Sequence, residues 1–256
     1  MKSPPNPAPA GLDELRRLCR QDPAEVSVLP TGLGIDPDLP HAGLLRGRVH
    51  EWLGLESSDT AGPNPGRFWS PPSTLLVHLA QAALHQADNA QARLVWVGRE
   101  IWPYPSVLAA PQGNDPLSCS LFVDATSPAQ RLWAVDLALR SRAAIAVIAN
   151  GAELDLASTR RLQLAAEASG AICFLARPPW ERSVLSASAT RWLVQTAPSP
   201  NRARRWTVSL LRCKGSHEAT RLWTLERDHA TRSFALVPNL RDRSGQATPA
   251  PIRLVG

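Results

Sequence analysis

Short apolar runs alternate with longer amphipathic stretches through the first two thirds of this chain, and this alternation restricts the fold more than any other feature. Serine followed by proline opens two of the amphipathic stretches, at Ser70 and Ser127, and Gly170 follows a third, over 157–169. The apolar runs are Arg48–Leu53, Leu94–Val97, Leu121–Val123, Ala144–Ala149 and Ala171–Leu175. Alternating strands and helices predict an α/β fold with a mostly parallel central sheet flanked by helices.

The pattern changes after Leu175. Four further strand candidates, over 191–195, 206–211, 222–225 and 233–237, are joined by connections too short to contain helices. They predict an antiparallel strand extension at the C-terminal end of the same sheet.

The domain organisation follows from where this pattern stops. Residues 1–25 are predicted to be a flexible Pro-rich tail with a short amphipathic helix over Leu12–Cys19, and residues 239–256 a disordered tail. A single domain over 26–238 remains, with a Pro-rich insertion at 62–72.

Several functional classes lack support in the sequence. No apolar run has the length of about 18 residues that spans a membrane, and the N-terminus has no signal-peptide core, so a cytoplasmic protein is expected. The four cysteines and six histidines show no metal-ligand spacing. Neither a GxSxG elbow nor an HExxH helix occurs. We therefore expect no metal and no cofactor.

Charge is distributed unevenly along the chain. Residues 1–176 carry 14 basic and 17 acidic side chains, for a net −3, whereas residues 177–256 carry 14 basic and 5 acidic ones, for a net +9. Only two of the basic residues are lysines. A GC-rich genome would explain the preference for arginine but not the asymmetry. The basic C-terminal region therefore indicates a surface for nucleic acid or an acidic partner.

The first strand-to-helix loop is where an α/β sheet of this kind binds a nucleotide. This loop starts at Gly54, but Asp59, Thr60 and Ala61 stand where a phosphate-binding P-loop has glycine, lysine and a hydroxyl residue. Asp59 places a negative charge where phosphates would bind, and the other two positions lack the cation and the magnesium ligand. A degenerate P-loop without nucleotide binding or ATPase activity is predicted.

Several segments resemble a known family. Leu29–Gly32 and Leu44–Glu51 are similar to the entry of the RecA ATPase core. Val95–Val97, Pro103–Pro105 and Arg140–Ile148 are similar to segments of the ImuA family of RecA-like proteins. The resemblance covers about residues 26–237 without the 62–72 insertion.

The resemblance implies a role in mutagenic translesion synthesis induced by DNA damage in the SOS response. The implied partners are an ImuB-like protein and an error-prone C-family polymerase, and whether RecA is a partner stays open. The resemblance also aligns Asn150 with the Walker B acidic position and Glu100 with the glutamate that activates water in RecA proteins. Asparagine lacks the carboxylate that helps orient magnesium. We expect Glu100 to be solvated or paired with Arg99.

Candidate nucleic-acid contacts lie in the basic C-terminal region. Arginine beside an exposed tryptophan can clamp a single strand, and basic turns contact phosphates. The candidates are Arg177, Trp180, Arg182, Arg202, Arg204, Arg205, Arg212 and Lys214. Alternatively, Trp180 covers the strand ends as part of the core, and the arginines at 202–205 form an ordinary solvated turn. Trp192, Trp206 and Trp223 lie in strand patterns and are expected in the core.

Three functional hypotheses follow. The first is a non-enzymatic RecA-like adaptor that docks the components of a mutagenic polymerase complex. The second is a single-stranded DNA-binding module that uses the basic C-terminal region, and it is compatible with the first. The third is an ATPase whose catalytic lysine comes from elsewhere, for which Lys214 is the internal candidate.

Overall fold

A computed structural model describes residues 27–58, 67–87, 89, 91–109, 115–199, 203–215, 221–228 and 230–237. The predicted N-terminal helix, both tails, Arg202 and residues 59–61 lie outside these ranges.

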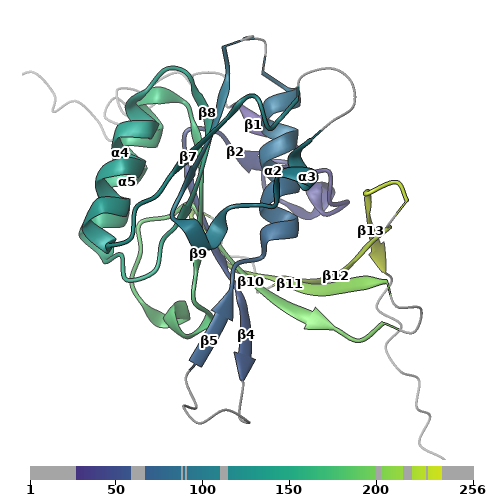
Figure 1. The fold of residues 1–256 in the computed structure, drawn as a ribbon. Coiled ribbons are helices and arrows are strands. Elements are labelled where there is room, and N and C mark those ends of the chain that lie inside the picture. The colour runs from purple at the N-terminus through teal and green to yellow at the C-terminus, as the bar shows by residue number, and fades with distance from the viewer. Residues whose placement is uncertain are drawn as a thin grey trace, which may run out of the picture.

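One nine-stranded sheet organises the fold (Figure 1). Six parallel strands lie side by side in the order β10 (Thr190–Ala197), β3 (Val49–Leu53), β9 (Ile172–Arg177), β8 (Ala144–Asn150), β6 (Arg93–Val97) and β7 (Ser120–Val123). Three antiparallel strands continue the sheet beyond β10, namely β11 (Arg204–Cys213), β12 (Arg221–Arg227) and β13 (Phe234–Val237). The predicted α/β class, with a mostly parallel sheet and an antiparallel C-terminal extension, is confirmed.

Helices cover both faces of the parallel part (Figure 1). Helix α2 (Ser73–His85) packs on one face, whereas α4 (Pro128–Arg140) and α5 (Leu156–Ser169) pack on the other. Side chains of β3 alternate between the two, so Trp52 joins the core beneath α2 while Val49 joins the core beneath α4 and α5. The expected core positions of Trp192, Trp206 and Trp223 are confirmed, and the Trp192 ring stacks on Trp52 with centroids 5.1 Å apart.

Local sequence signals account for the helix ends. Ser127 and Gln130 form a reciprocal capping box at the start of α4, and Gly170 ends α5 in the left-handed conformation that glycine favours. The predicted start of α2 at Ser70 is wrong by three residues. Ser70 instead pairs with Leu55 in a hairpin, and the helix begins at Ser73.

That hairpin consists of β4 (Leu55–Ser58) and β5 (Arg67–Ser70), and it projects from the end of the sheet (Figure 1). It occupies part of the segment predicted as a Pro-rich insertion. The remaining elements are short: β1 (Val28–Leu29), β2 (Leu44–Leu45), α3 (Pro105–Leu108) and the 3-10 turns η1 (Asp36–Asp38), η2 (Arg99–Ile101) and η3 (Pro179–Ser183).

The described residues contain no helix long and apolar enough to cross a bilayer. They also contain no cluster of three or more His, Cys, Asp or Glu side chains placed to hold a metal ion. Cys119 and Cys173 are buried free thiols, and Cys213 is half-buried.

Candidate functional site at the carboxyl edge of the sheet

The connection that follows β3 does not have the geometry of a phosphate-binding loop in its described part. The chain leaves β3 through Gly54, continues directly into β4 and returns as β5 before α2 begins. Gly54 is packed so tightly that a Cβ atom there would lie 2.3 Å from the Ser70 carbonyl oxygen. The described residues that follow Gly54, 55–58, therefore pair with 67–70 in the hairpin.

The first turn of α2 also offers few free amide donors. Pro71 and Pro72 have no N–H group, and Pro72 at the N-cap makes no side-chain capping bond. The Ser73 amide donates to the Pro71 carbonyl, and the Leu75 amide donates to that of Pro72. A helix start with its donors missing or occupied is a weak site for an anion.

A buried ionic network lies at the same edge, beneath the crossover from β9 to β10. Glu51 in β3 is completely buried and pairs with Arg177 in β9 and Arg191 in β10, at 2.9 and 2.7 Å. Ser186 donates a third hydrogen bond to this carboxylate at 2.7 Å. Arg177 also pairs with Glu181 in η3, at 2.6 Å.

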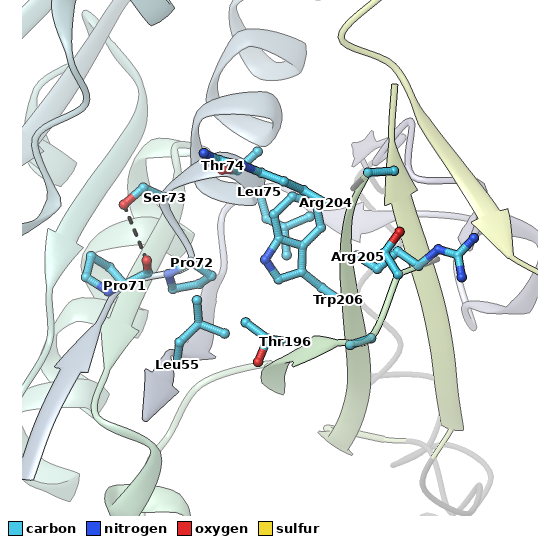
Figure 2. Close-up of a pocket in the computed structure, with 13 residues that line it drawn as sticks. Leu55, Pro71, Pro72, Ser73, Thr74, Leu75, Thr196, Arg204, Arg205 and Trp206 are labelled. Atoms are coloured by element: carbon cyan, nitrogen blue, oxygen red, sulfur yellow. Dashed lines mark hydrogen bonds between the residues drawn. The ribbon is translucent and has the colours of Figure 1, made fainter. Parts of the chain in front are cut away.

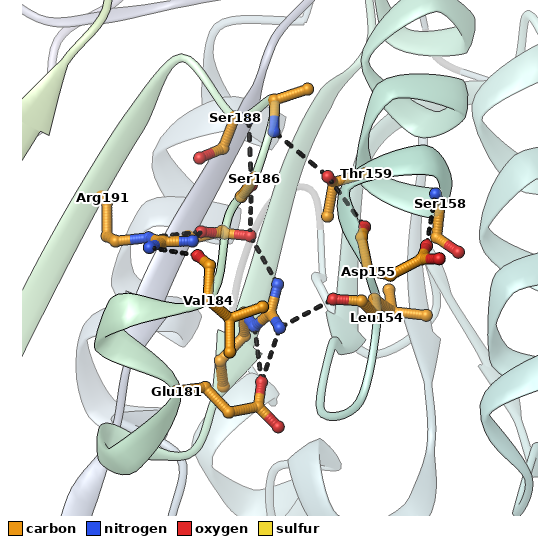
Figure 3. A network of polar contacts seen from close by, with 12 residues as sticks. Leu154, Asp155, Ser158, Thr159, Glu181, Val184, Ser186, Ser188 and Arg191 are labelled. Atoms are coloured by element: carbon orange, nitrogen blue, oxygen red, sulfur yellow. Dashed lines mark hydrogen bonds and ion pairs between the residues drawn. The ribbon is translucent and has the colours of Figure 1, made fainter.

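Backbone contacts extend the network into the crossover (Figure 3). Arg191 donates to the carbonyl oxygens of Arg182 and Val184, and Arg177 donates to that of Leu154. Burial alone would raise the pKa of Glu51, but the charges of the two arginines outweigh it and hold that pKa below its usual value. The network therefore keeps Glu51 ionised and fixes a crossover whose only helical element is the short 3-10 turn η3.

This network corrects the prediction for Arg177. Its side chain is fully buried and its guanidinium donates to Glu51, Glu181 and Leu154. A phosphate cannot reach this side chain unless the core opens. Arg177 is therefore a structural residue of the buried network.

The position aligned with Walker B has a structural partner. The side-chain amide of Asn150, at the end of β8, donates through Nδ2 to the Glu100 carboxylate at 3.1 Å and accepts through Oδ1 from the Ala152 backbone amide at 3.0 Å. Of the two expectations for Glu100, solvent exposure is confirmed, whereas pairing with Arg99 is wrong because Arg99 pairs with Asp124 instead.

The other predicted nucleic-acid residues lie at two opposite edges of the sheet. Arg204 and Arg205 begin β11 beside the carboxyl end of β10, because Ala197 pairs with Arg205. Arg212 and Lys214 lie beside the amino end, because Cys213 pairs with Thr190. The two pairs of basic residues therefore lie at opposite ends of β11 and do not form one surface.

Arg205 and Arg212 have contacts that limit their role. Arg205 pairs with Glu226 across the β11–β12 ladder. Arg212 donates to the Ser188 carbonyl oxygen. In η3, Trp180 is half-buried and Arg182 is exposed.

Lys214 is wrongly placed to complete a nucleotide site. Thr190, the partner of Cys213, also pairs with His50 near the start of β3, whereas Gly54 follows the last residue of that strand. The length of β3 separates the two positions by about 13 Å at a rise of about 3.3 Å per residue. The prediction that Lys214 supplies a P-loop lysine is therefore not supported.

A cavity of about 500 Å³ opens beside the hairpin, between the start of α2 and the beginning of β11. Figure 2 shows Arg204 and Trp206 beside Thr74 and Leu75, with Thr196 and Leu55 on the opposite wall. Of the predicted residues that the structure describes, Arg204 and Arg205 line this cavity.

Sequence reasoning missed the residues next to this cavity. Arg227, Arg232 and Tyr104 line a second, adjoining cavity together with Arg204. Tyr104 is the single tyrosine of the chain, but 100 residues separate it from Arg204, and only the folded sheet brings them together. Glu51 was also missed, although a charged residue within an apolar strand was a usable signal of a buried ion pair.

Comparison with known proteins relates most of this chain to one family. No family model matches this chain. The protein named "Protein ImuA" from two strains of Caulobacter vibrioides is 30% identical to it over 236 residues, covering 84% of this chain and 91% of the relative. Identity at this level over nearly the whole length of both proteins shows that the chain belongs to the ImuA family.

Proposed function

We propose that this chain is a non-enzymatic, RecA-like accessory protein of a mutagenic translesion synthesis complex that responds to DNA damage. In this role it docks an ImuB-like protein and an error-prone C-family polymerase. The supporting observation is the β4–β5 hairpin, which stands where a nucleotide-driven protein of this architecture needs its phosphate-binding loop. Membership of the ImuA family supports the biological setting.

The absence of catalysis is inferred from three features of the described residues. The amides at the start of α2 are missing or occupied, Asn150 replaces an acidic residue at the end of β8, and Lys214 lies at the opposite edge. Phosphoryl transfer depends on hydrogen-bond donors and cations placed around the phosphates. Because these groups are missing here, a role in binding partners is favoured over catalysis.

Association with partners tests the docking role directly. The full-length chain, tagged and co-expressed with the ImuB-like protein of the same organism, is expected to co-purify with it through gel filtration. Versions that lack residues 1–20 or 239–256 show whether either terminal segment makes the contact. If neither the full-length chain nor any version associates with the ImuB-like protein or the polymerase, the adaptor role is refuted.

A further inference from the structure

The second cavity is a groove between α2 and the antiparallel end of the sheet, with a volume of about 270 Å³. It adjoins the cavity beside the hairpin, because Ser73, Thr74 and Arg204 line both. The segment from Trp102 to Val107 forms one wall, and the ends of β11, β12 and β13 form the other. In Figure 1, β13 stands on the side of the sheet that carries α2 and α3. We call this second cavity the arginine groove.

Three arginines give the arginine groove its character. Arg204 in β11 lies directly opposite Arg227 in β12, and Arg232 lies in the following turn. One step along the same ladder, Arg205 lies opposite Glu226 and pairs with it. Like charges directly opposite each other destabilise a sheet, whereas opposite charges stabilise it. The Arg205–Glu226 pair is thus neutral, whereas the neighbouring Arg204–Arg227 pair carries two positive charges.

The three groove arginines have no carboxylate at ion-pair distance within the described part of the chain. None of them forms an ion pair there, and no acidic side chain lines the groove. Burial and the nearby charges of Arg232 and Arg204 lower the pKa of Arg227. A bound anion would relieve this repulsion.

Aromatic rings accompany the arginines. Tyr104 is 82% exposed, and Trp102 and Phe234 are half-buried in the walls. The groove therefore presents cations and one exposed ring, which match phosphate oxygens and a base face.

We propose that the arginine groove binds single-stranded nucleic acid, with Arg204, Arg227 and Arg232 on backbone phosphates and Tyr104 stacked on a base. This inference rests on the proposed function and adds a ligand to it. The exposed Tyr104 ring favours a nucleic-acid strand over an acidic peptide, because a base can stack on it. The two adjoining cavities have volumes of about 500 and 270 Å³, and none of the described residues that line them is a carboxylate that could hold magnesium.

Fluorescence anisotropy with 5′-labelled oligo(dT) of 20 nucleotides is the direct test. The full-length protein is expected to bind this probe, and affinity should fall steeply with salt as counterions are released. Unlabelled oligo(dT), ATP with magnesium and poly-glutamate are the competitors. Oligo(dT) is expected to displace the probe at far lower phosphate concentration than ATP, and poly-glutamate is expected to compete weakly.

Variants separate the parts of the proposed site. The double variant Arg204→Gln with Arg227→Gln should reduce the slope of log affinity against log salt by about 0.7 for each phosphate that is no longer neutralised. Tyr104→Ala should weaken binding roughly tenfold with little change in this slope, because stacking releases few ions. Arg232→Gln in the exposed turn is a second charge variant. Arg160→Gln on α5 is the matched control and should bind like the wild type.

Thermal unfolding without nucleic acid provides an independent readout. Removal of one of two opposed arginines should leave the melting temperature of Arg227→Gln unchanged or higher, even though this variant binds nucleic acid more weakly. If Arg227→Gln fails to fold, Arg232→Gln and Tyr104→Ala still test the groove.

Several results would overturn the inference. The inference is wrong if the wild type does not bind oligo(dT) at low salt, or if all the groove variants still bind it. It is also wrong if Arg182→Gln abolishes binding instead, or if ATP or poly-glutamate competes as well as unlabelled oligo(dT). Co-purification of the same variants with the ImuB-like protein keeps the two proposals apart. Variants that lose nucleic-acid binding but still associate with the ImuB-like protein support both proposals. A wild-type protein that associates with its partner but does not bind oligo(dT) refutes only the groove proposal.

Discussion

Replacement of Glu51 by glutamine should destabilise the fold strongly. The glutamine amide would keep the shape of the side chain but lose the charge and turn an N–H₂ donor toward Arg177 or Arg191, which are donors themselves. Removal of one partner of a buried ion pair costs about 3–5 kcal/mol. For a domain of this size, that loss corresponds to a fall in melting temperature of roughly 10 °C.

Urea unfolding at pH 7, monitored by tryptophan fluorescence, measures this loss. Glu226→Gln is the matched control, because Glu226 also pairs with an arginine on a neighbouring strand but is partly exposed. Its expected cost is below about 1 kcal/mol. Equal and small losses in both variants would refute the conclusion that the Glu51 network fixes the β9–β10 crossover.

The same network predicts a pH dependence in acid. The folded-state pKa of Glu51 lies below the unfolded value, so its contribution to stability is complete above about pH 4.3 and disappears as the pH falls through the folded-state pKa. The stability difference between the wild type and Glu51→Gln should therefore shrink in this range. A difference that stays constant down to pH 2 would contradict the assignment.

Two further substitutions test local features of the sheet. Burial lowers the pKa of His50 to about 4, below its unfolded value of about 6.5. The free energy of unfolding should therefore fall by up to about 3 kcal/mol as the pH decreases from about 6.5 to 4, and His50→Asn should remove most of this dependence. Chemical denaturation across this pH range checks it, and an unchanged slope in the variant would show that His50 is not the group responsible. Gly54→Ala should lower the melting temperature by clashing with Ser70, whereas Gly170→Ala, which has open space around it, should cost only about 1 kcal/mol. Equal losses in the two glycine variants would mean that the hairpin does not pack against Gly54 as described.

The regular part of the fold could be predicted from the sequence because apolar runs and helix-start signals are local. The hairpin could not. Phe68 and Trp69 are surrounded by prolines, glycines and serines, and the pairing of Leu55 with Ser70 joins residues 15 positions apart in the chain, which no local pattern indicates. Reading this segment as an insertion also placed the start of α2 three residues too early.

The candidate site was predicted less well because its contacts are long-range. Arg177 looked exposed beside prolines and a tryptophan, but its partner Glu51 is 126 residues away in the chain. Arg204 and Lys214 are near each other in sequence, yet an antiparallel strand carries them to opposite edges of the sheet. Only the strand register could show that Arg204 faces Arg227.

Isothermal titration calorimetry of the full-length protein with a non-hydrolysable ATP analogue and magnesium tests the central claim most directly. Because the β4–β5 hairpin follows β3, the proposed function predicts no saturable heat at micromolar concentrations of the analogue, with or without oligo(dT). Saturable micromolar binding, accompanied by hydrolysis of ATP itself, would contradict the proposal that this member of the ImuA family works without a nucleotide.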